Sequence, residues 1–274
     1  GNELIRPEWV PCAFDDENLV MLKGICDLHD PERLMLPTSP SGPSVGINLE
    51  KKGVSHDVHG QYKYEGVERH YYRYNNSDAM LHSEFGNDGM SNLSSIKTVL
   101  SKKDMIVTTE AENLIWRHHS EWWDTYAYRD KQLFGEITNL EDYIKISQYM
   151  QAEGLRYSLE ANRRRTWQNC GSIVWQFNEP WPNVSCTCIV DYYMKPKLAY
   201  YAFRDAMRVH SVSLRYDKLS YAPDEVFKAS LFVHNDLEDE SYTIRCKLLD
   251  EGKQELQSFT FGGKADGGAC VQAG

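Results

Sequence analysis

The stretch Met80-Leu81-His82-Ser83-Glu84-Phe85-Gly86 decides how the rest of the chain is interpreted. A short, mostly apolar run that ends in a turn residue is typical of a strand buried in a parallel sheet. This run delivers one carboxylate, Glu84, just before the glycine at which the chain must turn. In an α/β barrel the C-terminal ends of the strands carry the catalytic groups. Glu84 is therefore the first candidate for a catalytic carboxylate.

Strand-like and helix-like segments alternate around this stretch. A second buried run covers residues 171–182 and ends in polar and aromatic side chains that we expect on the same rim. Weaker strand candidates are residues 33–36 and 55–60, and a long segment after Gly86 predicts short helices that border a pocket. Helices are predicted at 17–28 after Asp15-Asp16, from the capping box Thr138-x-x-Glu141 to about Trp167, and from 197 to Met207. This alternation predicts an α/β fold with a parallel sheet.

The hydrophobic pattern changes from a period of 3.6 to a period of 2 near Val209. Four strands are predicted after that point, with residues 250–253 as a hairpin turn, and they cover 213–216, 227–233, 242–249 and 255–261. Short strands at this spacing indicate a β-sandwich module, which we expect to be left incomplete at Gly274. The predicted domains are therefore 1–208 and 209–274.

Composition and charge exclude several classes of function. The chain has 274 residues, 41% of them hydrophobic, and a net charge of −10. Because no basic cluster offsets phosphate repulsion, we expect no nucleic-acid partner. No apolar segment approaches the ~18 residues that span a bilayer, and no signal-peptide pattern is present, so we expect a soluble protein and no membrane partner. The compartment stays open, because any targeting segment would lie upstream of Gly1.

The seven cysteines are scattered, and only Cys186 and Cys188 lie close together. One intervening residue is not the usual zinc spacing, and no nearby histidine completes a ligand set. Buried thiols explain this pattern better than a metal site or disulfides do. We therefore expect no metal and no cofactor.

A carboxylate beside aromatic rings on one rim suggests a sugar site. Glycoside hydrolysis needs two carboxylates, one to protonate the departing oxygen and one to attack the sugar, and Glu84 and Glu3 are candidates for this pair. Trp175 and Trp181 are candidates to stack on the apolar face of a sugar, although both also suit packing in the core or at the rim. His59 and His82 are candidates to bind hydroxyls, although a structural histidine is the more common outcome for each.

Several ordered motifs make a family resemblance specific. The run from His82 to Gly86 resembles the nucleophile strand of glycoside hydrolase family 2, whose pattern is Ser-Glu-Phe-Gly, and Gly1-Asn2-Glu3-Leu4 looks like its Asn-Glu acid/base motif. Further segments also match that family in the same order: Asp30-Pro31-Glu32-Arg33 with Ser39-Pro40-Ser41, Asp57-Val58-His59, the helix with Gln148, Gln151 and Glu160, and Trp175-Gln176 through Trp181-Pro182 to Asp191-Tyr192. The β-mannosidase-like branch is the most similar.

The resemblance implies strands 4 to 8 of a (β/α)8 TIM barrel, followed by an immunoglobulin-like β-sandwich. It implies that Glu3 is the acid/base and Glu84 the nucleophile of a retaining exo-β-glycosidase that acts on a carbohydrate substrate. Asn2 would bind the sugar 2-hydroxyl, Trp175 would form the floor of the subsite, and His59 would border it. Two further residues of the same rim, Asn178 and Trp181, are added as substrate-binding candidates.

Departures from the family pattern leave alternatives open. Barrel strands 1 to 3 are absent, so we expect the chain alone to be inactive or nearly so, and to self-associate through open barrel edges. Glu179 stands where the family more often has Asp, and Asn87-Asp88-Gly89-Met90 also departs from the β-mannosidase version, so the sugar is open. The alternatives are a β-galactosidase, β-glucuronidase or exo-glucosaminidase activity, or a non-catalytic carbohydrate-binding module.

Overall fold

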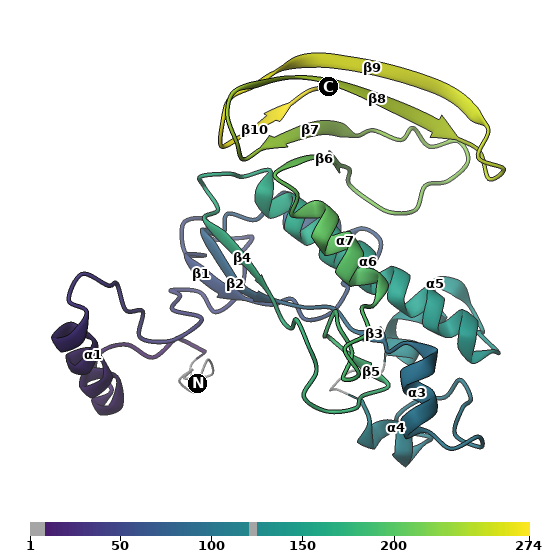
Figure 1. The fold of residues 1–274 in the computed structure, drawn as a ribbon, viewed down its shortest axis with the longest axis horizontal. Coiled ribbons are helices and arrows are strands. Elements are labelled where there is room, and N and C mark those ends of the chain that lie inside the picture. Colours follow the sequence, from purple (N-terminus) through teal and green to yellow (C-terminus); the bar gives the residue numbers. More distant parts are fainter. Residues whose placement is uncertain (1–8, 121–124) are drawn as a thin grey trace.

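A three-stranded parallel sheet lies at the centre of the chain. The computed structural model describes residues 9–120 and 125–274, and the sheet is formed by β1 (Asp57–His59), β2 (Leu81–Phe85) and β4 (Gly171–Val174), in the order β1-β2-β4. Helix α2 (Arg69–Asn75) lies in the connection from β1 to β2, and α6 (Leu140–Arg163) in the connection from β2 to β4 (Figure 1). Strands that follow one another in both sequence and space, with helical crossovers, are the repeating unit of an α/β barrel.

The strand predicted from residues 80–86 is confirmed as β2, the middle strand of this sheet. Its residues from His82 to Phe85 are buried, as the short apolar run predicts. The weaker prediction at 55–60 is confirmed as β1, and the run from Gly171 begins with β4. The predicted burial of that second run is wrong, because β4 is an outer strand of the sheet and Ile173 is 57% exposed. The prediction of a strand at 33–36 is wrong: these residues form a loop in which Leu34 is largely exposed, so the apolar letters there have no sheet to pack against.

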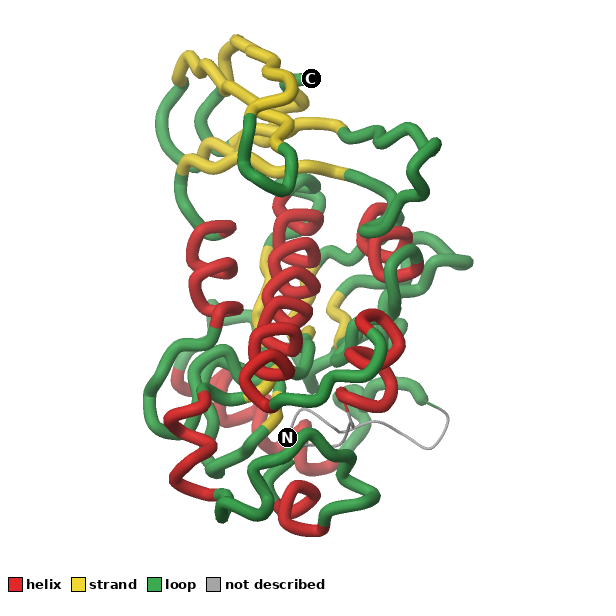
Figure 2. The backbone as a smooth tube through the Cα atoms, turned by 90° about the vertical axis from the view of Figure 1, so that its right-hand side faces the viewer, coloured by secondary structure: helices red, strands yellow, loops and turns green. Residues whose placement is uncertain are grey.

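Helix α6 is the longest element of the structure and covers the sheet, as Figure 2 shows from the side. Nine of its positions that recur at helical spacing in the sequence are buried, as an amphipathic helix predicts: Leu140, Tyr143, Ile144, Ser147, Gln151, Gly154, Leu155, Ser158 and Leu159. The predicted capping box is wrong by one residue, because the side chain of Asn139 caps the helix by accepting from the backbone N–H of Asp142. The helix ends at Arg163, four residues before the predicted end at Trp167.

Shorter elements surround this helix and sheet. Helix α1 (Glu17–His29) is capped by Asp16 as predicted, and lies apart from the other elements in Figure 1; Leu19 is its one buried residue. Between β2 and α6 the chain forms several short elements, as the sequence predicts: β3 (Gly89–Met90), α3 (Leu93–Val99), α4 (Leu114–His118), the π-helix η1 (Tyr126–Asp130) and α5 (Lys131–Phe134). After β4 follow β5 (Ser185–Cys186), which pairs with β3, and α7 (Leu198–Ala206), which packs on α6.

The C-terminal part forms two antiparallel sheets above α6 and α7 (Figure 1). One contains β6 (His210–Arg215), β7 (Ser230–Asn235) and β10 (Ala269–Gln272), and the other contains β8 (Glu240–Leu249) and β9 (Glu255–Ala265). The hairpin turn between β8 and β9 is confirmed. Sequence patterning missed β10 and ended β9 too early, because the glycines in this region interrupt the period of 2. The added strand makes five, and β9 contacts both β7 and β10 of the other sheet.

The described residues do not contain a closed barrel. Within residues 9–120 and 125–274 the parallel sheet has three strands, and β1 and β4 are its outer members. The α/β character of the fold is therefore confirmed, whereas the five-strand barrel segment, the immunoglobulin-like type of the sandwich and the division into domains at residue 208 stay predictions. None of the described helices is both long and apolar enough to cross a bilayer.

Candidate active site

Glu84 lies near the C-terminal end of β2, where the chain leaves the sheet. Its residue surface is only 9% exposed. The hydroxyl of Tyr62 donates a hydrogen bond to Oε2 of Glu84 at 2.6 Å, and Nδ1 of His59 lies 3.4 Å from the same oxygen. His59 is the last residue of β1, and Tyr62 follows shortly after it. The neighbouring strand and the loop after it therefore hold the carboxylate in a defined orientation.

A chain of polar contacts fixes the ring of His59 in turn. The hydroxyl of Ser39 lies 2.7 Å from Nε2 of His59 and donates to Oγ of Ser83 at 3.0 Å. Ser83 donates to Oδ1 of Asp57, whose Oδ2 accepts from the backbone N–H of Ser41 at 2.7 Å and from its hydroxyl at 3.0 Å. These five residues link the loop after α1 to β1 and β2. The motifs Ser39-Pro40-Ser41 and Asp57-Val58-His59 therefore support the site.

Tyr62 was missed by the sequence reasoning, although it makes the closest described contact to Glu84. It stands in the connection of residues 61–76, where no hydrophobic period marks a position. The available signal is its place just after the C-terminal end of β1, where side chains reach the rim of a parallel sheet.

The alternative for His82, a structural histidine, is the one that the contacts support. Its Nε2 lies 2.6 Å from the carbonyl oxygen of Gly60, its Nδ1 lies 3.2 Å from the amide nitrogen of Asn162, and its ring stacks on Phe85. Burial lowers the pKa of His82 to about 4, because a charged imidazole would lose its hydration there. His82 is therefore a neutral packing residue within β2, the strand that also carries Glu84.

Trp175 directly follows β4 and lies beside the end of β2. Its backbone N–H donates to the carbonyl oxygen of Phe85 at 2.8 Å, and Trp175 as a whole is 38% exposed. A Cβ on Gly86 would come within 2.4 Å of the carbonyl oxygen of Trp175, so only glycine permits this close approach of the two strands. Trp175 is thus at the same rim as Glu84, where its predicted role in the sugar subsite stays a prediction.

The other two rim candidates lie further along the same segment. Asn178 is exposed, and its backbone forms an isolated bridge with Val190. Trp181 stacks on the ring of His119, meets His118 edge to face, and donates from Nε1 to the carbonyl oxygen of His118 at 3.2 Å. For Trp181 the sequence left two alternatives, stacking on a sugar and packing in the core or at the rim. These contacts support packing at the rim.

Asn2 and Glu3 lie outside the described residues. Their roles in binding the sugar and in acid/base catalysis stay predictions from the sequence. The candidate site, as far as the structure describes it, consists of Glu84 with Tyr62 and His59, and of the polar groups behind them.

Cys186 and Cys188 are buried thiols, as the sequence predicts. Burial raises the pKa of the Cys186 thiol well above its usual range, because a thiolate would be poorly solvated there. A carboxylate, that of Glu179, lies next to both sulfurs. Among the described residues these three form the group whose donor atoms are close enough together to hold a metal ion.

Comparison with known proteins shows similarity to β-glycosidases. No protein-family model matches the chain. The chain is 27% identical over 249 residues to β-mannosidase B of Aspergillus niger and 24% identical over 246 residues to β-mannosidase B of Aspergillus flavus; these matches cover 85% and 84% of the chain. The chain spans only 29% and 28% of the length of these two enzymes.

Solved structures give the same result for the fold. The β-D-mannosidase of Dictyoglomus thermophilum superposes with a TM-score of 0.63 at 21% identity, and the exo-chitosanase CsxA of Amycolatopsis orientalis with a TM-score of 0.66 at 20% identity. Each match covers 92% of this chain and 30% of the enzyme. The chain therefore has the fold of a part of these enzymes. This agrees with the resemblance to glycoside hydrolase family 2 at the level of the class.

Proposed function

We propose that this chain carries the nucleophile half of a retaining exo-β-glycosidase, with β-mannosidase as the activity of the complete protein. The observation that carries the proposal is the position of Glu84: a nearly buried carboxylate at the C-terminal end of the middle parallel strand, oriented by Tyr62 and His59. The position of Trp175 at the same rim supports it, since an exposed indole suits stacking on a sugar ring.

The proposed reaction has two steps. Glu84 attacks the anomeric carbon while the carboxylic acid of Glu3 gives its proton to the departing oxygen, so that the glycosidic bond breaks and a glycosyl ester forms. Glu3, now a carboxylate, takes a proton from water, and the resulting hydroxide displaces Glu84 from the sugar. A retaining site of this kind has its carboxyl groups ~5 Å apart, against the ~6.5–9.5 Å of an inverting site.

The sugar is proposed from the relatives. The fungal enzymes to which the chain is similar are named β-mannosidase B, whereas one structural neighbour is an exo-chitosanase whose structures include one inhibited by a glucosamine-configured compound. An exo-glucosaminidase is therefore the second candidate. Rates of the full-length protein on nitrophenyl β-glycosides of mannose, glucosamine, galactose and glucuronic acid separate these activities. We expect the mannoside to be hydrolysed fastest, and the absence of turnover on every glycoside would overturn the proposal.

The chain alone should be inactive or nearly so. Among the described residues the parallel sheet has three strands, with β1 and β4 as its outer members, and a substrate needs groups from several strands at once. We expect the isolated 274-residue chain to hydrolyse nitrophenyl β-mannoside at a small fraction of the rate of the full-length protein. A rate close to that of the full-length protein would contradict this expectation.

Open edges also predict self-association of the isolated chain. Ile173 of the outer strand β4 is 57% exposed, and Phe177 beyond it is 53% exposed. Exposed apolar side chains on and beside an outer strand favour contact with other copies. Light scattering coupled to size-exclusion chromatography should therefore give a mass above that of one chain at micromolar concentration. A purely monomeric chain would contradict the prediction.

Removing the hydroxyl of Tyr62 should slow the proposed reaction. A hydrogen bond to a charged group contributes about 1.5–3 kcal/mol, so Tyr62→Phe in the full-length protein should lower kcat by roughly 10- to 100-fold. Tyr72→Phe, on the exposed side of α2, is the matched control and should leave kcat unchanged. Equal rates for Tyr62→Phe and the wild type would show that Tyr62 does not act on Glu84.

A further inference from the structure

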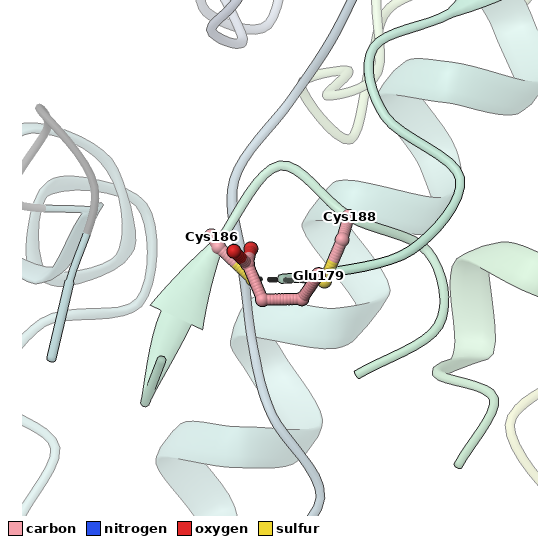
Figure 3. Close-up of side chains that lie close together, drawn as sticks. All are labelled: Glu179, Cys186 and Cys188. Carbon is pink, nitrogen blue, oxygen red and sulfur yellow. Dashed lines mark hydrogen bonds between the residues drawn. The ribbon is translucent and has the colours of Figure 1, made fainter. Parts of the chain in front are cut away.

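Two sulfurs and one carboxylate converge in the segment that follows β4. Sγ of Cys186 lies 2.8 Å from Sγ of Cys188, and the donor atoms of these residues and of Glu179 all lie within 4.8 Å of one another (Figure 3). All three residues are buried, and both cysteines are completely so. Sequence spacing did not reveal the group, because Glu179 joins the cysteines only through the path of the loop.

The carboxylate of Glu179 has a buried oxygen without a partner. Its Oε1 accepts from the backbone N–H of Trp181 at 3.3 Å, whereas its Oε2 is buried and has no hydrogen-bond partner among the described residues. The residue is only 7% exposed. A buried carboxylate oxygen left without a hydrogen bond or a cation is costly, so its place beside two sulfurs requires an explanation.

We propose that Glu179, Cys186 and Cys188 bind one divalent metal ion, with zinc as the best match. Thiolate sulfur with carboxylate oxygen is a ligand set that zinc accepts, and the fourth position of its tetrahedron would be filled by a water molecule or a backbone oxygen. Zn–S bonds of about 2.3 Å in a tetrahedral site separate the sulfurs by roughly 3.8 Å, so the two side chains need to part by about 1 Å.

The charges around the group suit a bound divalent cation. On binding, each thiol releases its proton to solvent, so the two thiolates and Glu179 carry three negative charges in total. The buried ammonium of Lys197 lies 3.5 Å from Sγ of Cys186 and donates to the carbonyl oxygens of Gly89 and Cys186. One divalent ion together with Lys197 balances these charges, which is the condition for burying ions at low cost.

A disulfide between Cys186 and Cys188 is the rival explanation. It would need an external disulfide or another two-electron oxidant to reach two fully buried thiols, and it would leave Oε2 of Glu179 without a partner. The metal accounts for the sulfurs and the carboxylate together.

The metal would hold the loop of residues 180–185, which carries Trp181 and follows Asn178 and Glu179. Helix α6 already holds the C-terminal end of this loop. The side-chain amide of Gln151 donates to the carbonyl oxygens of Cys186, Thr187 and Cys188 at 3.0 to 3.3 Å. A metal bridge from Glu179 to the two cysteines would tie the ends of the loop together. It is a structural role and does not depend on the proposed glycosidase activity.

The test is cobalt and zinc titration of the full-length protein after it is reduced and freed of metal. We expect one equivalent of Co²⁺ to produce thiolate-to-cobalt charge-transfer absorption, and zinc to displace it. Glu179→Gln and Cys188→Ser preserve side-chain shape and should each weaken zinc binding at least 10-fold. Cys170→Ser, which removes an exposed thiol, is the matched control and should bind like the wild type.

Thermal unfolding gives a second readout. Because a ligand that binds only the folded state stabilises it, zinc should raise the Tm of the wild type and of Cys170→Ser, and should leave that of Cys188→Ser nearly unchanged. The proposal is overturned if the reduced wild type shows no thiolate-to-cobalt band, or if Glu179→Gln binds zinc like the wild type. It is also overturned if the protein as isolated contains a Cys186–Cys188 disulfide. Mass spectrometry would then give a mass two hydrogens below that of the reduced protein and a peptide in which the two cysteines are linked.

Discussion

Replacing Glu84 by Gln in the full-length protein is expected to abolish turnover of aryl β-glycosides while leaving sugar binding intact. The substitution keeps the shape of the side chain and an acceptor for Tyr62, and removes the charge that attacks the anomeric carbon. Loss of a nucleophile costs roughly 10⁴-fold or more in kcat. Steady-state kinetics, with calorimetry for binding of the sugar product, measures both effects.

The matched control is Glu50→Gln, which changes an exposed glutamate on the loop before β1 and should leave kcat unchanged. The Glu84→Gln variant also separates an enzyme from a carbohydrate-binding module. In a binding module Glu84→Gln would change little, because no step of binding needs a nucleophile. Retention of kcat by Glu84→Gln would therefore show that Glu84 is not the nucleophile.

Mild acid is expected to destabilise the fold through buried histidines, of which His82 and His70 are two. Burial lowers the pKa of His82 to about 4 and that of His70 to about 4. In the unfolded chain both titrate near the ordinary histidine value of about 6.5. Between these values the unfolded state binds more protons than the folded state, so stability is complete above pH ~6.5 and is lost progressively as pH falls toward ~4.

The expected loss is on the order of 3 kcal/mol for each histidine, since one pKa unit corresponds to about 1.4 kcal/mol. Urea unfolding at a series of pH values measures it. His82→Asn should lower stability at neutral pH, because it disturbs the contact with Gly60, and should flatten the dependence between pH 6.5 and 4. His56→Gln changes an exposed histidine and is the control. An unchanged slope in His82→Asn would contradict the account.

The sequence predicts best where a local pattern and burial agree. The run from Met80 to Gly86 became β2 because its apolar residues fill the middle of a sheet, and nine positions of α6 that recur at helical spacing are buried. The strand at 33–36 failed because four apolar-rich residues do not make a strand without a neighbour to pair with. The cap of α6 moved from Thr138 to Asn139, since both side chains can accept from the first turn and propensity alone does not choose.

The candidate site shows the other limit of sequence reasoning. Glu84 and His59 were predicted as site residues because they stand at strand ends and match motifs, and the structure places Nδ1 of His59 3.4 Å from Oε2 of Glu84. The hydrogen bond from Tyr62 and the convergence of Glu179 with Cys186 depend on the paths of loops, and loops leave no periodic signal in the sequence. Contacts of this kind follow from the coordinates and not from residue spacing.

The most direct test of the central claim is to trap the glycosyl ester. The full-length protein is incubated with an activated 2-deoxy-2-fluoro-mannoside, which slows the second step, and is then digested and analysed by mass spectrometry. We predict one sugar per chain, attached to the peptide that contains Glu84, and no labelling of Glu84→Gln. A protein that hydrolyses mannosides but carries the label on another carboxylate would contradict the claim that Glu84 is the nucleophile.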